Sequence, residues 1–306
     1  MYQQLIPMSL VLLLGVLWRY ISPANLPTAQ VRSVLGVLII NFVAPALIVE
    51  VLLTSNLKQE LFQIPASGNV TIIIVLSLSL ALYTMLLRMN VITRAQAGAL
   101  VVASTFGNGM GMALPAVSAL LGLPQRDIPV VYDLLATVPF LWIIGVMLCA
   151  HFGTRVVNGG LGRELLRLPP FWALIIALIF RYFGLVLPEP MMKTLHLLGS
   201  AAVPLLLLMV GMTLHVGRNM RFGLLFSVVC LKLILSTGLA LSVGHLVGLQ
   251  GPALAATVLT AAAPPVGVGV ALCDRFRLDA ELFGTAMTIT TVLYVVFVPW
   301  LASSLV

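Results

Sequence analysis

The sequence predicts an all-α, multi-pass membrane protein with ten transmembrane helices in two inverted five-helix repeats. Its composition, its ten apolar runs and the alternation of basic residues between successive connections support this fold class. Hydrophobic residues make up 61% of the 306 residues and charged residues 8%, whereas a soluble domain carries about 25% charged residues. So few charges could not cover the surface of a soluble protein of this size, which argues against a soluble enzyme and against a nucleic-acid-binding protein.

Ten apolar runs have about the length that a helix needs to cross a hydrocarbon core of about 30 Å. In chain order the predicted spans are Leu5–Trp18, Leu35–Leu53, Val70–Leu87, Ala97–Leu121, Ile128–Ala150, Pro170–Leu187, Leu195–Leu214, Phe222–Val247, Pro252–Leu272 and Leu282–Leu301. The first run lacks a basic segment before it and a small-residue cleavage site after it, so we expect a membrane helix and not a signal peptide.

Basic residues fall mainly in alternate connections, and this sets the expected orientation. The odd-numbered connections hold eleven of them: Arg19, Arg32, Arg88, Arg94, Arg155, Arg163, Arg167, Arg218, Arg221, Arg275 and Arg277. The opposite side holds four: Lys58, Arg126, Arg181 and Lys193. The asymmetry places the odd-numbered connections in the cytoplasm and both termini outside it, in a cell inner (plasma) membrane.

Weak internal similarity supports two repeats, residues 1–152 and 170–306, joined by a cytoplasmic connection over 153–169. At one offset the second span matches the seventh, in the pairs Leu38 and Leu197, Pro45 and Pro204, Leu47 and Leu206, Val51 and Val210, and Thr54 and Thr213. Pro45 and Pro204 are the most informative pair, because a proline inside a span kinks the helix. With five spans in each repeat, the two repeats must lie upside down relative to each other, as in many secondary transporters.

The fourth and ninth spans carry residues that disfavour a continuous helix near their centres. The fourth has Gly107, Asn108, Gly109, Met110, Gly111 and Pro115, and the ninth has Ala263, Pro264, Pro265, Val266 and Gly267. A glycine-rich packing surface is one interpretation. We favour two broken helices that cross, because their second halves would begin in mid-membrane with positive N-terminal ends and attract an anion. Asn108 would then contact the substrate, the alternative being an interhelical hydrogen bond.

Three ionisable residues lie inside spans, where a charge is costly and usually serves a function or a pair. Asp133 and Lys232 are candidates for proton coupling and for a counter-charge, the alternative being a structural pair between them. Glu50 is a weaker candidate, because its position in the second span allows it to be solvated near the outer interface. His151, His196, His215 and His245 lie near span ends, and we interpret them as interfacial residues.

Two stretches resemble the auxin efflux carrier family of permeases: Ala103–Pro115 in the fourth span, and Leu198–Leu205 with Gly211–Leu214 in the seventh. The resemblance covers essentially the whole chain. It implies the ten-helix fold shared with plant auxin carriers and bile acid sodium symporters, in which spans three to five and eight to ten move against spans one, two, six and seven. The substrate site then lies where spans four and nine cross, and the substrates are malonate, malate, other small carboxylates or auxin-like acids.

Two departures from those relatives bear on substrate and coupling. The NPNxY-type crossover of the plant carriers is absent, which argues against auxin itself. The acidic residue that bile acid symporters carry in the ninth span is also absent, since residues 261–270 contain no Glu or Gln. This argues against sodium coupling through that site.

The sequence therefore predicts a secondary carrier of small organic anions, with an elevator-type alternating-access mechanism and neither a cofactor nor a metal site. A sodium-coupled symporter and a channel are the alternatives, and a homodimer is left open. An intramembrane enzyme is disfavoured because the spans contain no His-x-x-x-His or Gly-x-Gly-Asp pattern. An arsenite-type carrier is disfavoured because Cys149, Cys230 and Cys273 lie outside the fourth-span break.

Overall fold

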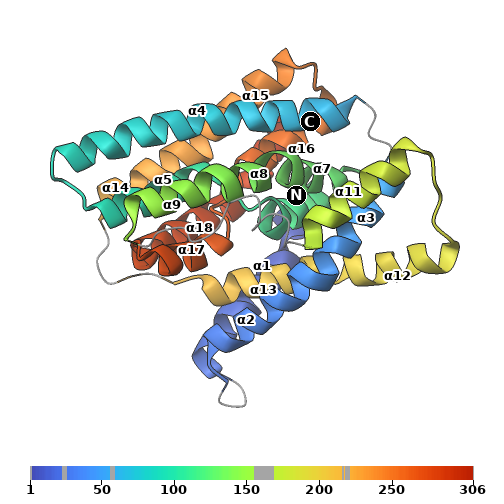
Figure 1. Ribbon diagram of the computed structural model, residues 1–306, viewed down its shortest axis with the longest axis horizontal. Coiled ribbons are helices and arrows are strands. Elements are labelled where there is room, and N and C mark those ends of the chain that lie inside the picture. The colour runs from blue at the N-terminus through green and yellow to red at the C-terminus, as the bar shows by residue number, and fades with distance from the viewer. Residues whose placement is uncertain are drawn as a thin grey trace. The chain divides into compact units, whose positions relative to one another are not determined.

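The computed structural model describes residues 2–22, 26–55, 59–154, 169–215, 217 and 221–305. Every regular element over these residues is a helix, so the predicted all-α class is confirmed (Figure 1). Seven helical segments of the described chain are long and apolar enough to cross a membrane: Gln3–Ile21, Thr28–Thr54, Glu60–Arg88, Leu123–Phe152, Glu189–Thr213, Phe222–Leu246 and Ala280–Leu305. These segments correspond to predicted spans one, two, three, five, seven, eight and ten.

Two of the other three predicted spans are interrupted, as their glycines and prolines indicate, and one is a shorter helix. The fourth divides into α5 (Arg94–Thr105) and α6 (Leu114–Leu120), and the ninth into α16 (Gly251–Ala261) and α17 (Val268–Phe276). The sixth is α11 (Pro169–Tyr182), which ends five residues before the predicted Leu187. Arg155, Arg163 and Arg167 of the preceding connection lie outside the described residues, as do Lys58 and Arg218.

The third predicted span begins ten residues too late. Helix α4 runs over Glu60–Arg88, not Val70–Leu87, and Pro65 lies inside it. Its first turns carry Gln63, Ser67 and Asn69, which lower the local hydropathy although the helix continues through them. Pro65 is the sixth residue of α4, beyond the first turn, so it removes the main-chain hydrogen bond to the Leu61 carbonyl.

The chain forms two compact units. The first comprises Met1–Leu5, Lys58–Asn158 and Leu214–Val306, and the second Ile6–Leu57 and Gly159–Thr213. The first unit thus contains predicted spans three to five and eight to ten, and the second contains most of the first span with spans two, six and seven. This is the grouping that the family resemblance implies. The two inverted sequence repeats are a separate matter and stay a prediction.

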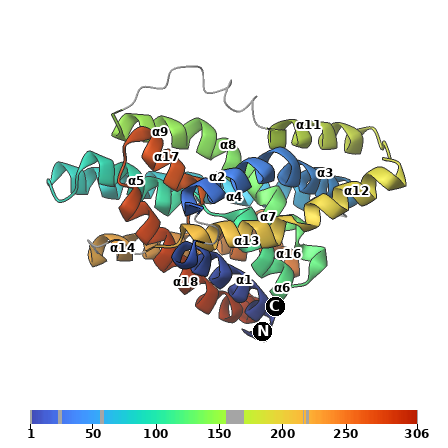
Figure 2. The same ribbon diagram turned by 90° about the horizontal axis from the view of Figure 1, so that it is seen from below.

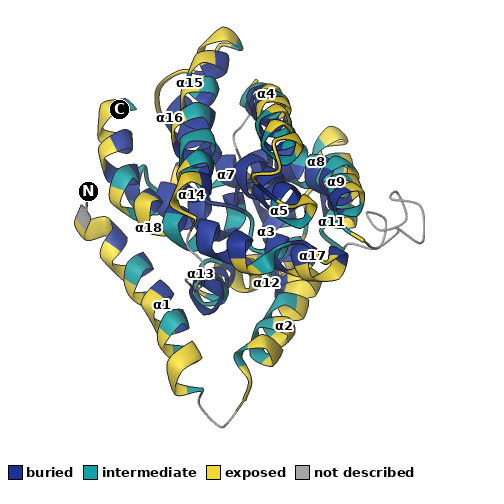
Figure 3. Ribbon diagram, turned by 90° about the vertical axis from the view of Figure 1, so that its left-hand side faces the viewer, coloured by how far each residue is buried: buried dark blue, intermediate teal, exposed yellow. Residues whose placement is uncertain are grey.

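In the first unit, α5 is buried over Ala97–Thr105 and α16 over Leu254–Ala261; Figure 3 colours the ribbon by burial. Around them lie α4, α7 (Asp127–Tyr132), α8 (Val138–Phe140), α9 (Val146–Phe152), α14 (Phe222–Val229), α15 (Ser236–Leu246), α17 and α18 (Ala280–Leu305). Every residue of α5 from Ala97 to Thr105 is buried. A helix buried on all sides is typical of the interior of a membrane protein, where its neighbours are helices and not lipid.

In the second unit, α3 (Ala44–Thr54) packs against α11 and α12 (Glu189–Ser200), and α13 (Ala202–Thr213) packs against α2 (Thr28–Leu38); Figure 2 shows this unit from a second side. Helix α1 (Tyr2–Ile21) meets α13 through two glycines. A Cβ atom at Gly15 would lie 2.9 Å from the Cα of Gly211. Glycine at both positions therefore permits close backbone approach, as in small-residue contacts between membrane helices.

Both predicted kink prolines lie at helix irregularities of the second unit. Pro45 follows a π-helical turn over Ile39–Val43, and Pro204 follows the interruption between α12 and α13 at Ala201. A proline lacks the N–H that would bond the carbonyl four residues earlier, and its ring crowds that carbonyl. The preceding turn widens or breaks for this reason.

Candidate substrate site

The two broken helices of the first unit pair through their main chains at the breaks. The Asn108 N–H donates to the Pro264 carbonyl at 2.8 Å, and the Val266 N–H donates to the Phe106 carbonyl at 3.0 Å. Gly107 and Pro265 form an antiparallel bridge between these two bonds. Pro264 and Pro265 have no N–H to continue helix α16, so the chain leaves the helix and satisfies its polar groups across the crossing.

Asn108 caps the second half of the broken fourth span. Its Oδ1 accepts the Gly111 N–H at 3.0 Å, at the start of a π-helical turn over Gly109–Ala113 that leads into α6. The side chain is 7% exposed. Its Nδ2 lies 4.0 Å from where a Cβ of Gly267 would be and donates no hydrogen bond within the described chain. The Oδ1 of this amide therefore has a structural role, and its Nδ2 is an available donor beside the ninth-span break.

Asp133 lies at the same half-helix end. Its Oδ2 accepts the Met110 N–H at 3.1 Å, and Gly109 contacts the same carboxyl group. It comes from the fifth span, where a π-helical turn over Asp133–Thr137 directs it inward, and it is 7% exposed. We expected both half-helix N-termini to attract an anion. At the first of them a carboxylate of the protein accepts a main-chain N–H, as a helix N-terminus favours.

Lys232 lies at the opposite end of the same break. Its Nζ is 3.4 Å from the carbonyl oxygen of Thr105, the last residue of α5, and the side chain is 3% exposed. A cation is stabilised at the negative C-terminal end of a helix. Although both are described, Lys232 and Asp133 form no direct ion pair. Each contacts one end of the interrupted fourth span, and the two side chains interact electrostatically without a direct hydrogen bond, so the alternative of a structural pair stays open.

Three glycines make these polar contacts sterically feasible. A Cβ at Gly107 would lie 2.9 Å from the Lys232 Nζ, and one at Gly109 would lie 2.9 Å from the Asp133 Cγ. A Cβ at Gly111 would overlap the Asn108 side chain. Each glycine of the Gly-x-Gly-x-Gly pattern therefore leaves room for one polar side chain. The sequence indicated helix breaking here, and the structure adds close packing as a second reason for glycine.

The N-terminal end of α17 is the other half-helix end at the crossing. Val266, Gly267 and Val268 are partly exposed, as is Met110 across the break, whereas Ala263, Pro264 and Pro265 are buried. The N–H groups of Gly267 and Val268 have no main-chain acceptor among the described residues. Pro115 lies in α6 beyond the π-helical turn and takes no part in the main-chain pairing. Of the eleven predicted substrate-site residues, the other ten lie in the two breaks.

A family model described as membrane transport protein matches residues 151–302. An uncharacterized transporter of Methanothermobacter thermautotrophicus is 26% identical to this chain over 276 residues, 87% of each protein. An uncharacterized transporter of Methanocaldococcus jannaschii is 25% identical over 206 residues, which cover 63% of this chain and 64% of that protein. The chain belongs to the auxin efflux carrier family of membrane transport proteins. The family resemblance is thereby confirmed; the family model itself includes the seventh span and does not extend to the fourth.

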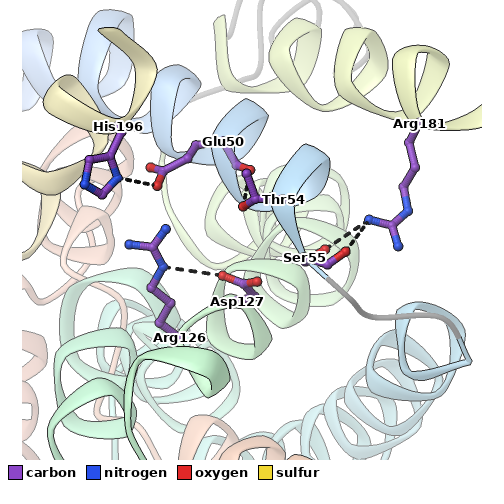
Figure 4. Close-up of polar contacts among 7 residues, drawn as sticks. All are labelled: Glu50, Thr54, Ser55, Arg126, Asp127, Arg181 and His196. Carbon is purple, nitrogen blue, oxygen red and sulfur yellow. Dashed lines mark hydrogen bonds and ion pairs between the residues drawn. The ribbon is translucent and has the colours of Figure 1, made fainter. Parts of the chain in front are cut away.

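This auxin efflux carrier family member also has a buried acidic residue in its second unit. Glu50 of α3 is 3% exposed, and its Oε1 lies 2.7 Å from Nδ1 of His196 on α12 (Figure 4). The sequence allowed Glu50 to be solvated near the outer interface, but the side chain is buried, because α12 packs over it. Gly199 allows this: its Cβ would lie 2.6 Å from the Glu50 Oε2. Glu50 therefore links predicted spans two and seven and does not belong to the crossing.

Two further polar contacts of the permease were missed at the sequence level. Arg181 of α11 donates to the Leu52 carbonyl at 2.7 Å and to the Ser55 carbonyl at 3.1 Å and so caps α3; Figure 4 shows its contact with Ser55. The Tyr294 hydroxyl of α18 donates to the Leu259 carbonyl at 3.1 Å, near the C-terminal end of α16. A buried tyrosine in an apolar span usually finds a hydrogen-bond partner, and this signal could have indicated Tyr294. The described residues contain no group of three or more His, Cys, Asp or Glu side chains that could hold a metal ion.

Proposed function

We propose that this family member is a secondary carrier of small organic anions that binds its substrate at the crossing of the fourth and ninth spans. The observation that carries the proposal is the pair of donors at that crossing: the Asn108 amide nitrogen and the N-terminal end of α17. A helix N-terminus attracts anions through its N–H groups and its dipole. An amide beside it adds a directional donor for a carboxylate.

The substrates of this carrier are small carboxylates such as malonate, malate or auxin-like acids, as the family resemblance implies. Partly exposed Met110, Val266, Gly267 and Val268 provide an apolar surface beside the two donors. Small-molecule sites commonly combine an apolar lining with a few polar groups that fix orientation. This combination supports a ligand with one charged head and a short carbon skeleton.

Transport proceeds by elevator-type alternating access in this proposal. Both breaks, Asn108, Asp133 and Lys232 belong to the first compact unit. A site built within one compact unit can change its exposure when that unit moves as a body against the other. The carrier lies in the inner (plasma) membrane as ten helices in two inverted repeats, with both termini outside the cytoplasm. A homodimer is compatible with this arrangement.

The test is ligand-induced thermal stabilisation of the purified protein with a panel of mono- and dicarboxylates. A ligand that binds the folded state raises the apparent melting temperature by mass action. We expect Asn108→Ala to abolish the stabilisation while the protein remains folded in detergent. Asn41→Ala is the matched control, because the Asn41 amide is exposed and donates to the Val37 carbonyl of its own helical turn. Unchanged binding by Asn108→Ala would remove the crossing from the mechanism.

Counterflow measurements in liposomes distinguish this carrier from a channel. A carrier preloaded with unlabelled substrate accelerates uptake of labelled substrate, because the loaded site returns faster than the empty one. A channel shows no such trans-stimulation. We expect trans-stimulation with the carboxylate that gives the largest thermal shift, and its absence would favour a channel.

A further inference from the structure

Lys232 lies beside the C-terminal ends of both broken helices. Its Nζ is 3.4 Å from the carbonyl oxygen of Thr105, the last residue of α5. A Cβ built on Gly107 would lie 2.9 Å from that Nζ and 3.3 Å from the carbonyl oxygen of Ala263, which follows the end of α16. Both atoms border the same point beside Gly107, so one ammonium group lies at the ends of two half-helices.

These two helix ends have carbonyl groups without main-chain partners. Within the described residues, no main-chain N–H donates to the carbonyl of Thr105 or to that of Ala263. Each C-terminal end of a helix carries about half a negative charge, so the two ends together carry about one, which one lysine balances. Asp133 accepts the Met110 N–H at the N-terminal end that follows the break, where the opposite helix end matches its charge.

Neutral hydroxyl groups hold the end of α5 against α4. The Thr105 Oγ1 lies 3.2 Å from the Ser79 Oγ, and the Ser104 Oγ lies 3.0 Å from the Tyr83 hydroxyl oxygen. These contacts fix the end of α5 without adding charge to it. The Lys232 side chain is 3% exposed, so water contributes little to balancing the two helix ends. A buried position lined by carbonyl oxygens favours a cation.

We propose that the Lys232 ammonium group occupies a cation site at the crossing, as a covalently held substitute for a dissociable metal ion. Half-helix C-terminal ends and main-chain carbonyls at helix breaks are the groups that hold sodium ions in secondary transporters. Lys232 supplies the charge that such an ion would supply, so carboxylate binding needs no sodium. This inference concerns the coupling step of the proposed carrier and rests on that proposed function for its substrate measurements alone.

The first test measures carboxylate-induced thermal shifts of the full-length protein in sodium chloride and in choline chloride at equal concentration. We expect the same shift in both salts, because choline is too large for a site that holds one ammonium group. A carboxylate shift that requires sodium would overturn this inference and leave the proposed function intact. Failure of every carboxylate in both salts would overturn the proposed function, and the substrate-free test of Lys232→Ala would still decide this inference.

Lys232→Ala removes the ammonium group and leaves space beside the Thr105 and Ala263 carbonyls. Without substrate, we expect this variant to melt about 2 °C or more higher in sodium chloride than in choline chloride. Its carboxylate affinity should fall at least about tenfold in choline and recover in sodium. Lys193→Ala is the matched control, because Lys193 is exposed and pairs with Glu189 at 2.7 Å. It should behave like the wild type in both salts.

Lys232→Met separates the charge of the side chain from the space that it fills. Methionine is apolar and leaves little room for an ion, so we expect carboxylate affinity at least about tenfold below wild type in both salts. Equal melting of Lys232→Ala in the two salts, or a sodium response equal to that of Lys193→Ala, would overturn the cation site. If Lys232→Ala folds in neither salt, Lys232→Met decides: wild-type affinity in choline would overturn the inference, and the expected loss supports it.

Discussion

Gly109 lies between two residues that make polar contacts at the crossing. The Asp133 carboxyl group lies against its Cα, and its neighbour Met110 donates a main-chain N–H to that carboxyl group. Its other neighbour, Asn108, caps the same half-helix. A side chain at position 109 would push Asp133 away from both the N–H and the helix end, so glycine here serves packing as well as backbone freedom.

We expect Gly109→Ala to weaken carboxylate binding at least about tenfold and to lower stability by about 1–3 kcal/mol, the usual cost of overpacking a core. The added Cβ would lie 2.9 Å from the Asp133 Cγ and force it to move. Thermal-shift titration with a carboxylate measures both effects. Gly238→Ala is the matched control, because no atom lies within 4 Å of its added Cβ. If the two variants titrate alike, the Gly109 contact has no importance for binding.

The sequence predicted which residues form the crossing. It did not predict which side chains contact one another there. Glycines and prolines in two apolar runs predict helix breaks, since both disfavour helices for local reasons. The Met110–Asp133 hydrogen bond joins residues 23 positions apart, and the Glu50–His196 contact joins residues 146 apart. Such contacts depend on how spans pack, and local propensity carries no information about them.

At the scale of elements, three π-helical turns precede prolines in the same way. Ile39–Val43 precedes Pro45, Gly109–Ala113 precedes Pro115, and Asp133–Thr137 precedes Pro139. Each proline is two residues past the turn, and its ring would crowd the carbonyl four residues earlier in a regular helix. The widened turn relieves that crowding. Two of the three turns border the crossing, so these prolines help to direct Asn108 and Asp133.

The start of α5 offers a stability test that does not involve the substrate site. Thr93 and Gln96 form a reciprocal capping box in which each side chain accepts a main-chain N–H of the other residue at 3.2 Å. We expect Thr93→Ala to cost about 1 kcal/mol, or about 2 °C in melting temperature, with unchanged carboxylate affinity. Differential scanning fluorimetry measures the shift. Thr194→Ala, an exposed position inside α12, should have little effect, and a similar fall in both variants would contradict the capping argument.

The ends of a span were predictable where the apolar run and the helix have the same limits. They were not predictable where polar residues extend the helix beyond the apolar run. Helix α4 extends ten residues before the apolar run because Gln63, Ser67 and Asn69 have acceptable helix propensity despite their polarity. The interruption of the fourth and ninth spans was predictable because it comes from glycine and proline. The π-helical turn at Lys232, over Cys230–Leu235, had no such local signal.

At the scale of the whole molecule, the two compact units draw on both halves of the sequence. The first unit joins Lys58–Asn158 with Leu214–Val306, and the second joins Ile6–Leu57 with Gly159–Thr213. Composition and periodicity gave no means of grouping the spans in this way, because every span is apolar. The grouping came from the family resemblance, which the matches to membrane transport proteins confirm.

Membrane orientation is testable by cysteine accessibility in intact cells. We expect single cysteines near either terminus to react with an impermeant maleimide, and one in the connection over 153–169 to be protected, because basic connections stay in the cytoplasm. The three native cysteines are replaced first, and permeabilised cells serve as the control that each site is reactive. Labelling of the 153–169 position in sealed cells would reverse the orientation.

The coupling ion is testable in proteoliposomes under separate sodium and pH gradients. We expect proton-linked or uncoupled transport, because the helix end nearest the ninth-span break has no acidic side chain to match a dehydrated sodium ion. Asp133 contacts the crossing and can exchange a proton. Accumulation driven by a sodium gradient alone would contradict this. If pH-driven transport persists in Asp133→Asn, transport is still coupled to protons, but Asp133 is not the residue that carries the proton.

The pairing of each glycine in the fourth-span break with one polar side chain also has a genetic consequence. Gly107 faces Lys232, Gly109 faces Asp133 and Gly111 faces Asn108. A random change to a larger residue at any of these glycines should be harmful alone, and shortening its partner should recover the lost space. Second-site suppressors of Gly107 variants should therefore arise at position 232, more than a hundred residues away, and related permeases should vary the two members of each pair together.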